Sequence, residues 1–206
     1  MSRSRQATNA PRDNSSPELK ARLRLEMLRD VEAQRVLDCF CGRGEMYARV
    51  YKERAAEYVG LDREKVHDPR LCLLMDNRQY LAAHDVTRFT VFDLDAYGCP
   101  WGLLYRVLER AGAGPLTVFV TDGLPEHARR NNKAPHIVSA TNHIPKGMTI
   151  PASVRWYEPM FKTMLLDVCG RHGWTLCRGL YAYNERRTVC YWGLHFERAN
   201  VPQMQM

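Results

Sequence analysis

The sequence predicts an α/β fold with a mostly parallel, seven-stranded sheet, helices on both faces and an antiparallel hairpin at the C-terminal end. Three observations lead to this prediction. Between residues 35 and 121, short apolar runs alternate with segments of helical periodicity, which is the order of a parallel sheet with right-handed crossovers. The last two apolar runs are separated by a short polar turn, which indicates a hairpin. A turn with two glycines follows the first run, where sheets of this kind bind ligands.

The expected strands are short runs rich in β-branched, aromatic and other apolar residues. They cover residues 35–41, 58–62, 69–75, 89–94, 116–121, 174–183 and 188–196. The expected helices carry apolar residues on one face and cover residues 17–33, 45–57, 101–111 and 158–172. The other face of the first helix is basic and carries Lys20, Arg22, Arg24 and Arg29.

The length of 206 residues suits one domain with a sizeable core. Residues 1–16 are polar and include three arginines, so we expect a disordered basic tail, followed by a single domain over residues 17–200. The net charge of +7 and the pI of about 9.1 favour a polyanionic partner such as nucleic acid. No apolar run reaches 18 residues, so no membrane-spanning helix is expected.

The first expected strand leads into a turn that reads VLDCFCGRG, residues 36–44. Glycines such as Gly42 and Gly44 let the backbone approach a ligand closely, and here they lie between a strand and a helix. A dinucleotide-binding turn has a third glycine where this chain has Tyr47. The aspartate before the glycines, Asp38, fits a ligand with a positive charge instead.

This stretch resembles motif I of class I S-adenosylmethionine-dependent methyltransferases, whose acidic residue lies near the methionine amino group of the cofactor. The resemblance implies a Rossmann-like class I methyltransferase fold that binds S-adenosyl-L-methionine at Asp38, Gly42 and Gly44. Asp62 ends the second expected strand, where a carboxylate can accept both ribose hydroxyls. Asp76 has the position of the family residue that meets the adenine amino group. For each aspartate, the alternative is a capping or turn residue.

The stretch FDLDAYGCPWG, residues 92–102, lies at the C-terminal end of the fourth expected strand. It resembles the catalytic loop of the tRNA (guanine-N2)-dimethyltransferase family, which reads roughly DxDP(F/Y)GSP. The resemblance implies that Asp95 orients the acceptor amine, that Tyr97 stacks on the base and that Asp93 belongs to the cofactor site. The alternative is a turn capped by Asp95 with Tyr97 packed in the core.

The resemblance to this family covers residues 35–123 and includes Thr121-Asp122 at the end of the next strand. It departs from the family at Ala96, where the family has proline, and at Cys99. A chain without that proline has a less rigid loop. The family members are also much longer and carry an additional C-terminal domain.

Residues 122–157 contain several prolines and glycines and show no clear period, so we expect a basic loop that lies over the active site. Its basic side chains would hold the phosphates of a nucleic acid, and the candidates are Arg129, Arg130, Lys133 and Lys146. The alternative is a solvated basic surface.

The seven cysteines are scattered without a CxxC pair, so no metal site is expected. Their odd number and the lack of a secretory signal indicate the reducing cytoplasm. Cys39 and Cys41 lie in an expected buried strand and are interpreted as core residues. In C5-pyrimidine methyltransferases the nucleophilic cysteine follows a proline, whereas this chain has Cys99 before Pro100, which disfavours a covalent route.

Together these features predict a methyltransferase (EC 2.1.1.-) that transfers a methyl group directly, without a metal, to an exocyclic base amine of RNA, as in tRNA, or of DNA. One alternative is a methyltransferase that acts on a protein or a small molecule. Another is a nucleic-acid-binding protein that has the fold and does not catalyse the reaction.

Overall fold

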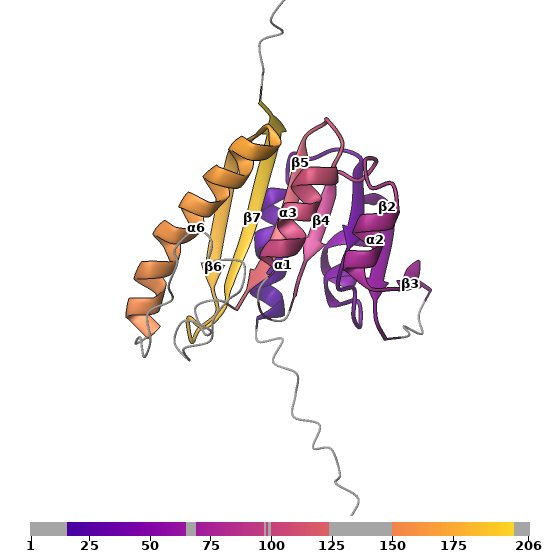
Figure 1. Cartoon of the computed structure of the whole chain (residues 1–206). Coiled ribbons are helices and arrows are strands. Elements are labelled where there is room, and N and C mark those ends of the chain that lie inside the picture. The colour runs from indigo at the N-terminus through magenta and orange to yellow at the C-terminus, as the bar shows by residue number, and fades with distance from the viewer. Residues whose placement is uncertain (1–15, 65–68, 97, 99, 124–149, 200–206) are drawn as a thin grey trace, which may run out of the picture.

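The computed structural model describes residues 16–64, 69–96, 98, 100–123 and 150–199, which build a seven-stranded sheet (Figure 1). The strands are β1 (Gln34–Asp38), β2 (Ala55–Asp62), β3 (Cys72–Leu74), β4 (Val91–Leu94), β5 (Leu116–Asp122), β6 (Trp174–Tyr183) and β7 (Cys190–Arg198), in the order β3-β2-β1-β4-β5-β7-β6. The strands β1 to β5 run parallel, whereas β7 is antiparallel to both β5 and β6. The predicted sheet with its C-terminal hairpin is therefore confirmed.

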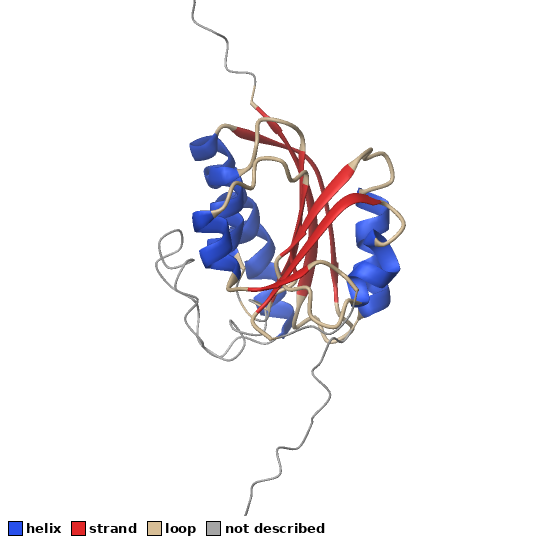
Figure 2. Ribbon diagram, turned by 90° about the vertical axis from the view of Figure 1, so that its right-hand side faces the viewer, coloured by secondary structure: helices blue, strands red, loops and turns tan. Residues whose placement is uncertain are grey.

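Helices lie on both faces of this sheet (Figure 2). They are α1 (Pro17–Met27), the π-helix η1 (Tyr47–Tyr51), α2 (Asn77–Ala83), α3 (Trp101–Arg110) and α6 (Ile150–His172). α1 and η1 pack together on one face, and α2, α3 and α6 pack on the other. A parallel sheet needs cover on both faces because both are apolar. None of the helices in the described part of the chain is long and apolar enough to cross a membrane.

The larger core lies between the sheet and the helices α3 and α6. Trp101, at the start of α3, is fully buried and packs edge-on against Phe161 of α6, with ring centroids 4.5 Å apart. Phe161 stacks in turn on Trp192 of β7, with centroids 3.7 Å apart and ring planes within 2° of parallel. Aromatic pairs of this kind bury large areas and prefer defined geometries. They fix α3 and α6 against the end of the sheet where the antiparallel strands lie.

Several element boundaries differ from the prediction, among them the starts of β2 and α6. β2 begins at Ala55, so residues 55–57 belong to a strand and not to the end of a helix. α6 begins at Ile150, so residues 150–157 are helical, whereas the prediction placed them in a loop over 122–157. The prolines of this segment suggested a loop, but Pro151 falls in the first turn of α6, where proline is tolerated.

The sequence analysis also missed α2 and overestimated α1. α2 is only seven residues long and lacks a full apolar period, but Asp76 caps it by accepting hydrogen bonds from the backbone N–H groups of Arg78 and Gln79. α1 ends at Met27, although the apolar spacing that predicted it continues to Val31. The cap at Asp76 therefore accounts for α2. α1 ends where the chain approaches β1.

α1 lies against β7 at a glycine. A Cβ atom at Gly193 would lie 2.5 Å from Cγ of Met27, closer than real side chains allow, and 3.3 Å from Cε1 of Phe119, which is a tight contact. A strand glycine often marks a place where another element approaches closely. Gly193 therefore allows α1 to pack directly on the sheet.

We expect Gly193→Ala to lower the free energy of unfolding by about 1 to 3 kcal/mol, the usual cost of adding volume to a packed core. The matched control is Gly179→Ala in β6, where the nearest atoms to a new Cβ lie 3.8 and 3.9 Å away. Urea denaturation of both variants measures the difference. Equal stability of the two variants would contradict this account of how α1 docks.

Candidate functional site

Each of the five parallel strands ends in an aspartate or is followed closely by one. These aspartates are the last residues of three strands, a residue near the end of β4 and two residues just beyond strands: Asp38 of β1, Asp62 of β2, Asp122 of β5, Asp93 of β4, Asp95 after β4 and Asp76 after β3. Because the strands are parallel, the carboxyl ends meet at one edge of the sheet, where ligands of open α/β sheets bind. The structure therefore brings the predicted aspartates to the same edge.

The glycine turn is tied to the end of β2. Gly42 and Gly44 have φ angles of +43° and +80°, a region that favours glycine. The backbone N–H of Gly42 donates to Oδ2 of Asp62 at 2.9 Å, and that of Glu64 donates to Oδ1 at 2.9 Å. Each carboxylate oxygen of Asp62 can accept a further hydrogen bond, because an ionised carboxylate has about four lone-pair sites.

Arg70 holds the same turn from the other side, and the sequence analysis missed it. Its guanidinium donates to the carbonyl oxygens of Cys41 at 3.1 Å and of Gly42 at 2.9 Å, and it is 9% exposed. A Cβ atom at Gly44 would lie 2.5 Å from the guanidinium carbon, so a larger residue here would displace the Arg70 side chain, and the positive φ angle itself favours glycine. Arg70 belongs to no motif, and no sequence signal identified it.

Asp38 is a buried carboxyl at the end of β1, with 3% of its surface exposed. The hydroxyl of Tyr58 donates to its Oδ2 at 2.9 Å, and the backbone N–H of Phe40 donates to its Oδ1 at 3.2 Å. Burial and the neighbouring charge of Asp93 raise the pKa of Asp38 from 3.8 to about 7. A cationic group bound beside Asp38 would offset this cost and favour its ionised form.

Asp93 is fully buried and forms an ion pair with Arg24 of α1. The guanidinium donates to both carboxylate oxygens, at 2.7 and 2.6 Å, and the hydroxyl of Tyr51 donates to Oδ2 at 2.6 Å. Arg24 itself is 1% exposed. The sequence analysis placed Arg24 on a basic helix face, but the structure divides this face: Lys20 and Arg24 are buried against the sheet, whereas Arg22 and Arg29 are exposed. That Asp93 contacts the cofactor stays a prediction. In the structure, its carboxylate accepts hydrogen bonds from the protein side chains of Arg24 and Tyr51.

Asp95 lies just beyond β4 and is engaged by Lys20, which is 4% exposed. The ammonium group of Lys20 lies 2.7 Å from Oδ1 and 2.8 Å from Oδ2. Burial alone would raise the pKa of Asp95, but the charges of Lys20 and Arg24 outweigh it and hold this pKa below its ordinary value. Asp95 is therefore an ionised acceptor at neutral pH, and its side chain remains 15% exposed.

Hydrogen bonds of the backbone close the loop that follows Asp95. The N–H of Ala96 donates to the carbonyl of Leu94 at 2.8 Å, a bond that proline at this position could not form. The N–H of Gly123, after β5, donates to the carbonyl of Gly98 at 2.8 Å. These bonds restrain the loop where the family resemblance led us to expect proline. Tyr97 lies outside the described residues.

Asp76 lies beside α2 and is accessible. In addition to capping α2, it accepts a hydrogen bond from Nε of Arg63 at 2.8 Å. Partial burial would raise the pKa of Asp76, but the hydrogen bonds from Arg63 and the helix N–H groups outweigh it and lower this pKa. Asp76 is thus the capping residue named as the alternative, and it is also a partly exposed carboxylate that is paired with Arg63 at the predicted position.

Asp122 joins β5 to the two helices α3 and α6. Its Oδ2 accepts hydrogen bonds from Nε1 of Trp101 at 2.8 Å and from the hydroxyl of Tyr157 at 2.8 Å. Nε1 of Trp192 donates to the same hydroxyl at 2.9 Å. Tyr157 is fully buried, so it belongs to this structural network and not to a surface that stacks on bases.

The buried cysteines behave as core residues. Cys39 is 1% exposed and Cys41 is 4% exposed. Burial raises the pKa of both thiols above the ordinary value, which keeps them protonated and poorly nucleophilic. Both observations agree with the interpretation of these residues as part of the core.

Four predicted phosphate-binding residues, Arg129, Arg130, Lys133 and Lys146, lie outside the described residues. Within the described part, a groove of about 320 Å³ runs along the outer side of α1. Its lining consists of three arginines, one leucine and one glutamate: Arg22, Arg29, Arg54, Leu25 and Glu26. The groove is therefore mainly basic.

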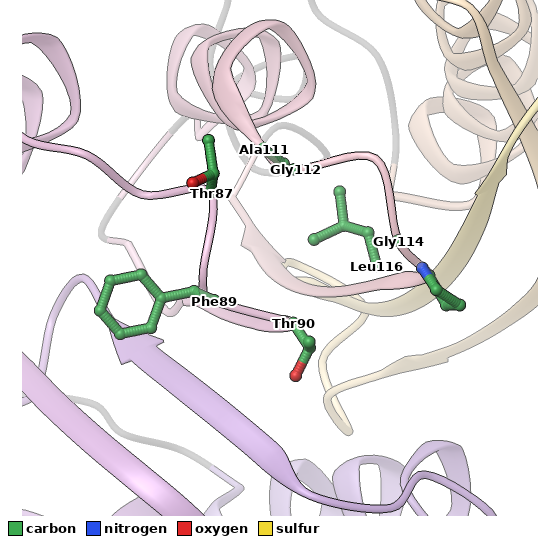
Figure 3. Close-up of a pocket in the computed structure, with 8 residues that line it drawn as sticks. Thr87, Phe89, Thr90, Ala111, Gly112, Gly114 and Leu116 are labelled. Atoms are coloured by element: carbon green, nitrogen blue, oxygen red, sulfur yellow. The ribbon is translucent and has the colours of Figure 1, made fainter.

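A small cavity lies at the opposite edge of the sheet, between the segments that precede β4 and β5 (Figure 3). It has a volume of about 30 Å³ and is lined by residues that include Thr87, Phe89, Gly112 and Leu116. A volume of this size holds roughly one or two water molecules. It is too small for a cofactor, so the edge with the aspartates remains the candidate site.

Comparison with solved structures relates the fold to methyltransferases. Trm1 from Pyrococcus horikoshii, solved in complex with S-adenosyl-L-methionine, matches with a TM-score of 0.62 at 16% identity, over 89% of this chain and 56% of Trm1. M. jannaschii TYW2, in complex with AdoMet, matches with a TM-score of 0.51 at 11% identity, over 88% of this chain and 77% of TYW2.

A third match is 1,6-didemethyltoxoflavin-N1-methyltransferase from Burkholderia thailandensis, with bound 1,6-didemethyltoxoflavin and S-adenosylhomocysteine. Its TM-score is 0.52 at 14% identity, over 91% of this chain and 80% of that enzyme. No protein-family model and no curated protein matches the sequence. The structural likeness confirms the predicted class I methyltransferase fold, and the chain spans little more than half the length of Trm1.

The raised pKa of Asp38 predicts a pH-dependent stability. Between pH 3.8 and about 7, the folded chain keeps a proton on Asp38 that the unfolded chain releases, so the free energy of unfolding falls as the pH rises through this window. Without cofactor, the wild type should lose at least about 1 kcal/mol more than Asp38→Asn between pH 5 and pH 8. Urea denaturation at both values measures this loss. Asp30→Asn, at an exposed position, is the control. Parallel pH curves for wild type and Asp38→Asn would contradict the raised pKa of Asp38.

Proposed function

We propose that this chain is an S-adenosylmethionine-dependent methyltransferase that acts on nucleic acid, at an exocyclic base amine of RNA or DNA. One observation carries the proposal. A methyltransferase fold presents, at the carboxyl edge of its parallel strands, the glycine turn after Asp38, the carboxylates of Asp62 and Asp76, and the ionised carboxylate of Asp95.

The residues at this edge fit the cofactor. Asp38 is buried and has no cationic partner among the residues that the structure describes, so it suits the methionine ammonium group. The turn at Gly42 and Gly44 lets a ligand approach the backbone. Asp62 keeps lone pairs for the two ribose hydroxyls, and Asp76 is accessible for the adenine amino group. The bound cofactor would supply an electrophilic methyl group.

In this reaction the protein would mainly position the acceptor amine against the methyl group of the cofactor. An ionised Asp95 accepts hydrogen bonds from the N–H groups of an amine, which directs the nitrogen lone pair away from the carboxylate. Tyr97 is proposed to stack on the base, as the loop resemblance implies. Asp93 is proposed to hold β4 in place against α1, because Arg24 and Tyr51 donate hydrogen bonds to its carboxylate.

Charge supports nucleic acid as the partner. The chain has a net charge of +7, and the groove along α1 is lined by Arg22, Arg29 and Arg54. Guanidinium groups bind phosphates well because their planar fork donates two hydrogen bonds. Arg129, Arg130, Lys133 and Lys146 are proposed to add phosphate contacts.

Cofactor binding tests the first half of the proposal. We expect S-adenosylmethionine and S-adenosylhomocysteine to bind the wild type in isothermal titration calorimetry. Asp62→Ala should weaken binding by about 10- to 100-fold, because it removes hydrogen bonds to a charged acceptor. Asp30→Ala, at an exposed position outside the site, should leave the affinity unchanged. If the wild type binds neither ligand, the proposal is wrong.

Methyl transfer tests the second half. Wild type incubated with cofactor carrying a radiolabelled methyl group should label RNA or DNA when tRNA, rRNA, DNA and protein are offered separately. Asp95→Asn keeps the size of the side chain but loses the carboxylate, so it should reduce labelling at least about 100-fold. Its affinity for the cofactor should change less than threefold. Equal losses of binding and labelling would mean that Asp95 is structural, and labelling of protein alone would exclude nucleic acid as the substrate.

A further inference from the structure

α1 and β4 carry matching pairs of opposite charges. Lys20 and Arg24 are four residues apart on a helix, which separates them by about 6 Å along its axis. Asp93 and Asp95 are two residues apart at the end of an extended strand, which separates them by about 6.6 Å on the same face. Because the two spacings agree, one helix face pairs with both carboxylates at once, Arg24 with Asp93 and Lys20 with Asp95.

Lys20 is held in a defined place. Its side chain is 5% exposed, and its ammonium group lies 5.4 Å from the centroid of the Tyr191 ring on β7. One turn further along α1, the bidentate pair of Arg24 with Asp93 fixes the helix against the sheet, and Arg24 also donates to the carbonyl oxygen of Lys20 at 3.1 Å. The backbone that carries Lys20 is therefore anchored independently of Asp95.

The contact leaves Asp95 able to bind another donor. Lys20 lies within hydrogen-bond distance of both oxygens, at 2.7 and 2.8 Å, which uses about two of the four lone-pair sites of a carboxylate. The side chain of Asp95 is 15% exposed, so the remaining sites can be reached from one side. An exocyclic amine has two N–H groups, which is the number of donors that these remaining sites can accept.

The ammonium group also sets the charge of Asp95. The charged groups that face it are Lys20 and Arg24 of α1, Asp93 of its own strand and Asp38 of β1. The two carboxylates favour a proton on Asp95, and the two cations oppose it. The cations prevail, and the pKa of Asp95 is held below its ordinary value despite burial. Without Lys20, Arg24 would be the remaining cation of this group, and it is already paired with Asp93.

We infer that Lys20 is a positioning residue for methyl transfer, which fixes the carboxylate of Asp95 so that its free lone pairs meet the N–H groups of the acceptor amine. This inference rests on the proposed function of Asp95. It gives α1 a part in the active site beyond covering the sheet. It also adds a side-chain restraint on Asp95 to the backbone hydrogen bonds that Ala96 and Gly98 form.

The test compares Lys20→Met and Lys20→Arg with the wild type in steady-state methylation of the nucleic acid that the wild type labels. Lys20→Met should lower kcat by about 10- to 100-fold, the usual effect of losing the placement of a reacting group. The Kd for S-adenosylmethionine should change less than threefold. Lys20→Arg should restore part of kcat, because it keeps the charge with a different geometry. Lys52→Met, at an exposed lysine, is the matched control and should have wild-type kcat.

The pH dependence separates positioning from a purely structural role. Removal of a cation raises the pKa of Asp95, so the acid limb of the kcat profile of Lys20→Met should move to higher pH than in the wild type. The pKa of Asp95 can be read directly from the carboxyl carbon in protein labelled with ¹³C-aspartate, with the signal assigned through Asp95→Asn. Lys20→Gln, which keeps a hydrogen-bond donor without the charge, replaces Lys20→Met if the latter does not fold.

Two results would overturn the inference, and they differ in whether the proposed function also fails. If Lys20→Met is as active as the wild type at temperatures where it is folded, with an unmoved acid limb, Lys20 is structural and the proposed function stands. If the wild type binds the cofactor but labels none of the offered substrates, the proposed function fails, and the inference fails with it.

Discussion

The fully buried ion pair between Arg24 and Asp93 is the interaction on which the arrangement of the site depends. Taking both charges out of water is costly, and removal of one partner from such a pair typically costs about 3 to 5 kcal/mol. The cost is offset here because the guanidinium meets both carboxylate oxygens and the hydroxyl of Tyr51 donates to one of them. The pair fixes the position of α1 on β4, and with it the place of Lys20 beside Asp95.

Two carboxylates at the same edge of the sheet have opposite environments. Burial and the charge of Asp93 raise the pKa of Asp38 to about 7, whereas Lys20 and Arg24 lower the pKa of Asp95. Environments that separate the pKa values of neighbouring carboxylates commonly assign them different roles. Asp38 is suited to a bound cation, which would stabilise its ionised form. Asp95 remains an acceptor without help from a ligand.

Much of the fold could be predicted from the sequence because it is encoded locally. Alternating apolar runs and helical periods define a parallel sheet, and the polar turn before Cys190 defines the hairpin. Elements with weak local signals were missed or misplaced. The short helix α2 depends on its cap at Asp76, and α6 begins at Ile150, within a segment whose prolines suggested a loop. The departure at Ala96 had a consequence that only coordinates reveal, since its N–H donates to the carbonyl of Leu94, a bond that proline could not form.

The sequence by itself determined the class of fold, the glycine turn and the aspartates that end the strands, because each is a pattern over a few neighbouring residues. The tertiary structure alone decided which groups these aspartates meet. Arg24 and Asp93 are 69 residues apart and Lys20 and Asp95 are 75 apart, and basic residues on a helix face usually point to solvent. Their burial follows from the packing of α1 over Gly193 and from the agreement between helical and extended spacing. The equal spacings bring the charges together only when α1 and β4 lie side by side.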